Sequence, residues 1–248
     1  MQTPHWFYTV WPFIGVGGAI VMVAILLTTD TFRGSPTVSR WRDPMWLAWL
    51  AVPLYWIHQF EEYSLPVLGL DYSIQELICK KIGFPPYPDC PIPLAFYPVV
   101  NIALMWFGAP LAAYLFRRNV LIGLSFWGLL FANGLVHTAG GVAAGGYNTG
   151  LWSAAFLFVP FSLWVIYVSA IRGPYSGKVV AVAYAAGAVT HVLLFMGYGL
   201  FKAGLFGSAG LLVFAAVIGF APIILAATAS KFFKPELLRP VPAQQATA

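Results

Sequence analysis

The chain has 248 residues, of which 60% are apolar and 17% aromatic, while only 8% are charged. A soluble domain of this size carries roughly a quarter charged residues, so the composition excludes a water-exposed globular enzyme. The formal net charge is +5, but the Lys and Arg residues are scattered over short loops without forming a stripe. The charge therefore does not indicate a nucleic-acid partner.

Seven apolar runs are each long enough to cross a bilayer, for which about 20 residues suffice. The predicted spans are residues 9–28, 44–62, 94–116, 120–143, 151–171, 179–201 and 205–230. Glycine and proline clusters separate them, and the break between the last two is the weakest. The sequence predicts an all-α polytopic membrane helix bundle. A single transmembrane domain covers residues 1–230, with a long loop at about 63–93, and a cytoplasmic tail follows at 231–248.

Basic residues are divided unevenly between the two sets of alternating loops. One set contains ten of them: Arg33, Arg40, Arg42, Arg117, Arg118, Arg172, Lys178, Lys231, Lys234 and Arg239. The other set contains three: Lys80, Lys81 and Lys202. Because cytoplasmic loops are enriched in Lys and Arg, the amino terminus is predicted outside and the carboxyl terminus in the cytoplasm.

The two cysteines of the chain, Cys79 and Cys90, lie in the long loop that the charge distribution places outside. Disulfides persist in oxidising compartments, so this location predicts a Cys79–Cys90 bond. The alternative is a pair of free thiols in a hydrophobic loop.

Two carboxylates, Glu61 and Glu62, touch a predicted span and follow His58 on one helix face. A charged side chain deep in a membrane helix costs about 2.5–3.5 kcal/mol on insertion scales, so such residues generally have partners and a function. The alternative is that both carboxylates lie just beyond the span, solvated at the outer surface.

Two more histidines, His137 and His191, fall in spans that run in the same direction as the span of His58. At about 1.5 Å per residue, His58, His137 and His191 lie about 21, 26 and 18 Å from the inner ends of their spans. Asn133, one turn before His137, lies at about 20 Å. This common level predicts a shared site in the outer half of the membrane, although lone histidines in helices also serve simply in packing.

The string His58-Gln59-Phe60-Glu61-Glu62 resembles the defining motif of the HXXEE family of bacterial integral membrane proteins. Residues 133–137 and 147–150 are similar to the second block of that family, in which a proline often occupies the position of Thr149. The resemblance covers roughly the second to the sixth span and implies a protein of the bacterial inner membrane. The family name describes a motif and not a reaction, so it implies no mechanism.

Imidazoles and carboxylates together are the ligands of zinc and of non-haem iron. We predict that a divalent metal is bound by His58, His137 and His191, joined by Glu61 or Glu62. The other carboxylate would act as a general acid or base, and Asn133 would orient a ligand or the substrate. A two-metal site and a metal-free polar network are the alternatives.

The leading functional hypothesis is a metal-dependent membrane enzyme, a hydrolase or oxidoreductase, acting on a lipid or another small hydrophobic substrate. A Glu in an apolar pocket has a raised pKa, so a metal-free isomerase or cyclase of isoprenoid-type substrates is an alternative. A proton-coupled transporter and a non-catalytic partner subunit are two others. Transporters commonly contain internal repeats, and the sequence has none.

Overall fold

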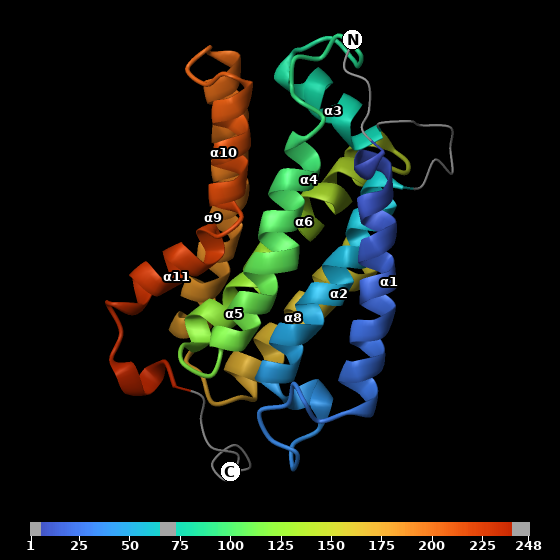
Figure 1. The fold of residues 1–248 in the computed structure, drawn as a ribbon. Helices are drawn as coiled ribbons and strands as arrows, with labels where there is room; N and C mark the ends of the chain where they lie inside the picture. The colour runs from blue at the N-terminus through green and yellow to red at the C-terminus, as the bar shows by residue number, and fades with distance from the viewer. Residues whose placement is uncertain (1–5, 65–72, 240–248) are drawn as a thin grey trace.

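The structure is a computed structural model that describes residues 6–64 and 73–239. These residues form helices and connecting loops, without a strand (Figure 1). The helices are α1 (Phe7–Thr28), α2 (Pro44–Tyr63), α3 (Ser73–Ile82), α4 (Phe96–Asn101), α5 (Ala109–Leu115), α6 (Val120–Ala144), α7 (Leu151–Ser153), α8 (Val159–Ile166), α9 (Gly177–Lys202), α10 (Ser208–Ile218) and α11 (Ala221–Ser230). Three π-helical segments, η2 (Ile102–Gly108), η3 (Ala154–Phe158) and η4 (Tyr167–Ile171), join α4 to α5, join α7 to α8, and extend α8. Two 3₁₀ turns complete the set, η1 (Arg40–Arg42) and η5 (Pro235–Leu237).

Five helical segments are long and apolar enough to cross a membrane: 7–28, 96–115, 120–144, 151–171 and 177–202. The pair α10 and α11 gives a sixth if it counts as one bent span. Helix α2 is absent from this set, because its second half carries His58, Gln59, Glu61 and Glu62. The predicted all-helical, membrane-type bundle is thus confirmed, with five to six candidate spans. The seventh span, and the side of the membrane on which each terminus lies, stay predictions.

The predicted span 205–230 is not one straight helix. Helices α10 and α11 meet at 50° across Gly219 and Phe220. Pro222 lies in the first turn of α11, where its missing amide hydrogen interrupts the helical hydrogen-bond ladder. Gly219 permits a close approach at this point, since a Cβ there would lie 2.5 Å from the Cβ of Ala103.

Side-chain caps fix the starts of the three helices that carry the candidate site residues. Asp43 accepts hydrogen bonds from the amides of Met45 and Trp46 and begins α2. Asn119 begins α6 and Ser176 begins α9 in the same way. Such caps stabilise a helix by about 1 kcal/mol each, and here they set the axial level of every residue further along.

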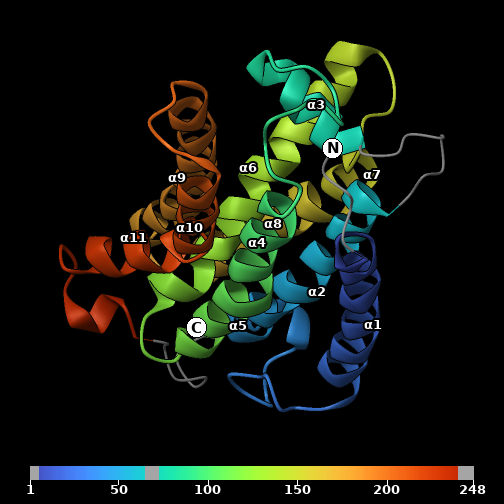
Figure 2. The ribbon, with the colours of Figure 1, turned by 45° about the horizontal axis from the view of Figure 1, so that its top comes forward.

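Helix α6 forms the centre of the bundle, and α1 lies at its edge. In the most apolar window of α6 78% of the residues are buried, against 28% for α1. Helix α6 contacts α2, α5, α8, α9 and α11, whereas α1 packs along α2. Figure 1 shows α9 and α10 on the opposite side of the bundle from α1, and the tilted view of Figure 2 agrees.

The predicted disulfide is confirmed: Cys79 and Cys90 are bonded. The long predicted loop contains helix α3, which packs against α2 and α9 at the end of the bundle where α1 begins (Figure 1). Both cysteines are buried in a cluster with Ile92 and Phe96. The disulfide therefore ties α3 to the chain that enters α4; residues 65–72 of the same loop lie outside the described residues.

The predicted tail begins with an ordered stretch. Leu238 is buried, and its carbonyl oxygen accepts a hydrogen bond of 2.9 Å from the amide of Val120 at the start of α6. Leu238 thereby anchors the end of the described stretch to the start of α6. The rest of the predicted tail, 240–248, lies outside the described residues.

Candidate functional site

A buried histidine–carboxylate group forms where the end of α2 meets α6. His58 and Glu62 are one helical turn apart on α2 and so share a face. Glu62 Oε1 lies 3.1 Å from Nε2 of His137, which is on α6, and 3.5 Å from Nε2 of His58. His58 is 0%, Glu62 7% and His137 8% exposed. All three offer a ligand atom, and these atoms lie within 4.8 Å of one another, a spacing suited to one metal ion.

The hydrogen bond that His137 makes through Nδ1, on the side of the ring away from Glu62, determines which ring nitrogen carries the proton. His137 Nδ1 lies 2.8 Å from the carbonyl oxygen of Thr149. A carbonyl can only accept, so Nδ1 carries the proton and the neutral ring turns an unprotonated Nε2 toward Glu62.

His58 is fixed in the same tautomer through a serine. His58 Nδ1 lies 2.8 Å from Ser153 Oγ, and Ser153 donates its only hydroxyl proton to Glu61 Oε2. The serine must therefore accept from His58 Nδ1, which leaves Nε2 unprotonated in the neutral ring. His58 Nε2 is buried without a hydrogen-bond partner. With both rings neutral, two imidazole lone pairs and a carboxylate thus face each other with no donor among them.

Glu61 occupies a different place from Glu62. Glu61 is itself a residue of α2, and its carboxylate reaches the start of α7. Its oxygens accept hydrogen bonds from the amides of Trp152 (2.9 Å) and Ser153 (2.7 Å), from the Ser153 hydroxyl and from Tyr147 OH (3.1 Å). Burial and the Glu61 charge raise the pKa of Tyr147 to about 12, so this phenol stays protonated and donates. Glu61 therefore caps a helix and, through Ser153, orients His58.

Gly150 allows the two imidazoles to come together. Its φ is +81°, a left-handed conformation that favours glycine. A Cβ at this position would lie 2.7 Å from His58 Cε1 and 3.0 Å from His137 Nδ1. The loop between α6 and α7 thus presses its backbone directly against both rings.

The structure places His191 and Asn133 beside each other, apart from this group. Asn133 lies one turn before His137 on α6, and its Nδ2 is 3.4 Å from Nε2 of His191 on α9. Among the residues that the structure describes, the metal-type group contains neither His191 nor Glu61. Of the five predicted ligands, His58, Glu62 and His137 are brought together, while Glu61 and His191 each have another neighbour.

A cavity of about 130 Å³ adjoins the histidine–carboxylate group. The polar side chains that line it include Glu62, Lys81, Asn133, His137, Asn148, Thr190 and His191. The rest is mostly apolar and includes side chains of α3 such as Leu77 and Ile78. Four of its polar atoms are buried without a hydrogen-bond partner: Asn133 Oδ1, Asn148 Oδ1, Thr190 Oγ1 and His191 Nδ1.

Sequence reasoning missed the groups that orient the two imidazoles. Ser153 and the carbonyl of Thr149 act on His58 and His137 from the loop and first turn before α8. A serine in the first turn of an otherwise apolar span was a usable signal for Ser153. A backbone carbonyl leaves no signal in the sequence.

The fold and the site together define a class: an all-helical membrane-type bundle with a buried His/Glu group at the meeting of two central helices. Residues 49–165 match the family described as "Protein of unknown function with HXXEE motif". This matched segment, which contains His58, Glu61, Glu62, His137 and Ser153, therefore belongs to the HXXEE family. No curated protein and no solved structure matches the chain.

Proposed function

We propose that the protein is an integral membrane enzyme in which His58, Glu62 and His137 hold a divalent metal ion, zinc or iron. The observation that carries this proposal is the convergence of His58 Nε2 and His137 Nε2 on one carboxylate oxygen of Glu62. With both rings neutral, these three atoms have no donor among them. Buried polar groups are nearly always paired, and a cation at their common centre satisfies all three at once. Two histidines and one glutamate with further open positions are ligands of catalytic zinc and of non-haem iron.

The metal, when bound, would supply Lewis acidity for hydrolysis or, if it is iron, redox chemistry for oxidation. The chain's own residues have separate tasks. Ser153 and the Thr149 carbonyl hold the two rings with their Nε2 atoms inward, and Glu61 holds Ser153. Such outer hydrogen bonds typically change metal affinity 10- to 100-fold.

The substrate that fits the adjoining cavity is a hydrophobic molecule with one small polar group. A cavity of about 130 Å³ is close to the roughly 150 Å³ that binds benzene in an engineered apolar site, so it accepts a chain or ring segment. Asn133 donates to His191 Nε2, which leaves His191 Nδ1 as a donor and Asn133 Oδ1 as an acceptor. A hydroxyl group can bind both. The proposed substrate is therefore a lipid or isoprenoid-like alcohol, drawn from the surrounding membrane lipids.

The proposed setting is the bacterial inner membrane, with seven spans, the amino terminus outside and the site in the outer half. Helix α2 would be the seventh span. It is flanked by α1 and α6 within the bundle, so its polar end faces protein and not lipid, as intramembrane charges do.

A metal-free acid–base isomerase or cyclase is the second candidate, supported by the 3.1 Å contact between His137 Nε2 and Glu62. A single proton shared in this contact would satisfy the pair without a metal. It would leave His58 Nε2 without a partner, which is why the metal enzyme is preferred.

The test is conversion of a membrane lipid extract by the protein in vesicles, with zinc or with iron(II) and oxygen, followed by mass spectrometry. With zinc we expect two cleavage products whose masses add up to that of the lipid plus one water. With iron(II), oxygen and added ascorbate as the two-electron reductant, we expect a product that has gained one oxygen atom, the other oxygen atom leaving as water. Either conversion should be lost on chelation and in Glu62→Gln and retained in Glu76→Gln, a carboxylate change on α3 outside the site. Conversion that survives both chelation and Glu62→Gln would contradict the metal enzyme; conversion lost in Glu62→Gln but indifferent to chelation would favour the metal-free candidate.

A further inference from the structure

A second, larger cavity of about 1280 Å³ lies at the other end of the bundle from the histidine–carboxylate group. The loop between α1 and α2, the turn between α5 and α6, and the link between η4 and α9 form its walls. Five arginines from four separate segments line it: Arg42, Arg117, Arg118, Arg172 and Arg239. In the sequence these residues are scattered, and only the fold brings them around one space.

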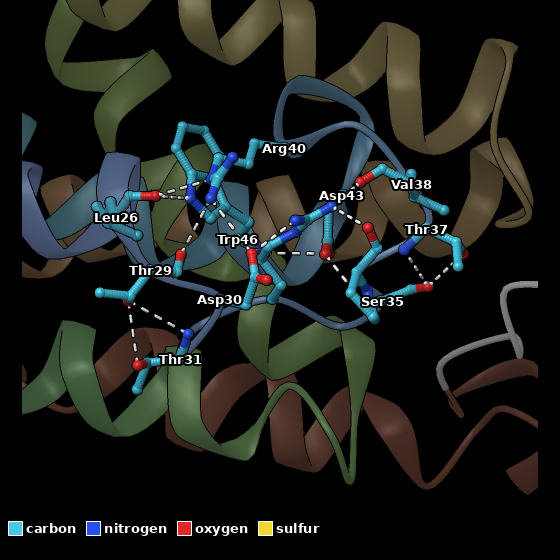
Figure 3. Close-up of polar contacts among 12 residues, drawn as sticks. Leu26, Thr29, Asp30, Thr31, Ser35, Thr37, Val38, Arg40, Asp43 and Trp46 are labelled. Carbon is cyan, nitrogen blue, oxygen red and sulfur yellow. Dashed lines mark hydrogen bonds and ion pairs between the residues drawn. The ribbon is translucent and has the colours of Figure 1, made fainter.

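Within the part of the chain that the structure describes, no carboxylate forms an ion pair with the arginines of this cavity. Asp43 is the acidic side chain that lines it, and its carboxylate accepts hydrogen bonds from the amides of Gly34 (2.7 Å), Ser35 (3.2 Å), Met45 (3.0 Å) and Trp46 (3.2 Å). Figure 3 shows Asp43 engaged in this way within the loop. Within residues 6–64 and 73–239, the ion pairs of arginine involve Arg33 and Arg40 and none of the five cavity arginines.

Hydrogen bonds within the chain hold the wall that carries Arg42 in place. Arg40 bonds to the carbonyls of Leu26 and Thr29 and to Asp30, and Trp46 Nε1 donates to Leu26 O at 2.8 Å (Figure 3). These contacts fix the loop against the ends of α1 and α2. This wall of the cavity is therefore fixed by the protein itself, which lowers the entropic cost of binding a ligand there.

The chemistry of the lining selects an amphiphilic anion. Guanidinium groups match phosphate oxygens with paired hydrogen bonds, and buried Met45, Phe116 and Val168 add apolar surface beside them. Drug-sized ligands occupy pockets of about 300–1,000 Å³, so this space far exceeds what one inorganic phosphate fills. The general enrichment of Lys and Arg at one membrane face explains their presence at this end, but not their convergence on one cavity.

We propose that this cavity binds the phosphate-bearing head group of an anionic membrane lipid. The site is separate from the histidine–carboxylate group, so the proposal stands independently of the proposed enzymatic function. Basic pockets between membrane helices recognise lipid phosphates by the same physics.

The test compares lipids and variants on the full chain in detergent, with native mass spectrometry to count bound molecules and the melting temperature to report stabilisation. The probes are phosphatidylglycerol, phosphatidylcholine and inorganic phosphate. We expect phosphatidylglycerol to bind and raise the melting temperature, and the other two to do neither at the same concentration. Arg117→Gln/Arg118→Gln should weaken phosphatidylglycerol binding about tenfold or more, whereas Lys231→Gln/Lys234→Gln, with the same loss of charge outside the cavity, should retain it.

Equal binding of phosphatidylglycerol and phosphatidylcholine would overturn the proposal, as would equal losses in the two double variants. Tight binding of inorganic phosphate alone would replace the lipid by a soluble phosphate ligand. The lipid comparison uses the unaltered chain, so it decides the proposal even if an arginine variant does not fold.

Discussion

Replacing Glu62 by glutamine is expected to weaken zinc binding by at least about 100-fold, more than the loss of an orienting hydrogen bond costs at metal sites. The change keeps the shape of the side chain but removes the charge that, with two neutral imidazoles, would hold the ion. The measurement is a competition titration of the metal-free protein against a chromophoric chelator.

The same variant should not lower the melting temperature of the metal-free protein. Glutamine can present an N–H group to His137 Nε2, where the wild-type carboxylate oxygen lies 3.1 Å away, and so supplies the donor that the group lacks. If Glu62 and His137 instead form a structural ion pair, breaking it would cost about 3–5 kcal/mol. A clear drop in the melting temperature of metal-free Glu62→Gln would therefore contradict the metal site.

Glu61→Gln is the matched control, one residue away and equal in chemistry. Glu61 accepts from the amides at the start of α7, so its loss should lower stability by about 1 kcal/mol, the usual value of a helix cap. Zinc affinity should fall less than in Glu62→Gln, because Glu61 acts on His58 only through Ser153. Equal zinc affinities in the two variants would contradict the separate roles assigned to these carboxylates.

Gly150→Ala should weaken zinc binding although it replaces none of the proposed ligand residues. A Cβ at residue 150 would lie 2.7 Å from His58 Cε1, which forces the ring to shift. Metal sites require their groups within about 0.5 Å of the productive geometry. We expect a loss of zinc affinity of about tenfold or more and a lower melting temperature, measured by the same titration and by thermal unfolding.

Gly145→Ala is the control that distinguishes the clash with the imidazoles from the backbone strain of an alanine in the left-handed conformation. Gly145 also has a positive φ, +66°, but nothing lies within 4 Å of a Cβ built there. Both alanines bear the left-handed backbone cost of about 1–2 kcal/mol, and only Gly150→Ala meets the imidazoles. Zinc affinity that falls equally in both variants would mean that Gly150 does not position the rings.

The sequence is sufficient to locate the helices because their apolar length and their caps are local properties. The predicted range 120–143 corresponds to α6, and Asn119 supplies its cap. The bend between α10 and α11 lies beside Pro222, a residue type that by itself predicts a kink. The close packing of Gly219 against Ala103 at this bend depends on another part of the fold and cannot be predicted from the local sequence. Helix α3 was not predicted either, since it lies in a segment too short and polar to read as a span.

The sequence was sufficient to name the residues of the candidate site, but not to predict which of them contact one another. The spacing of His58 and Glu62 on one helix, and the common level of His137, led to the group that the structure contains. Glu61 and Glu62 are adjacent in the sequence and chemically identical, so their separate places depend on where α7 begins. His191 contacts Asn133 and not the histidine–carboxylate group, because its direction depends on how α9 packs against α6, which the sequence does not specify.

The most direct test of the metal site is the X-ray absorption spectrum of the full-length protein loaded with one equivalent of zinc. His58, His137 and Glu62 as ligands predict two imidazole nitrogens at about 2.0–2.1 Å and carboxylate oxygen at about 2.0–2.2 Å, with the imidazole signal reduced in His137→Ala. A spectrum with oxygen ligands alone, or one identical in wild type and His137→Ala, would show that this buried group does not hold the ion.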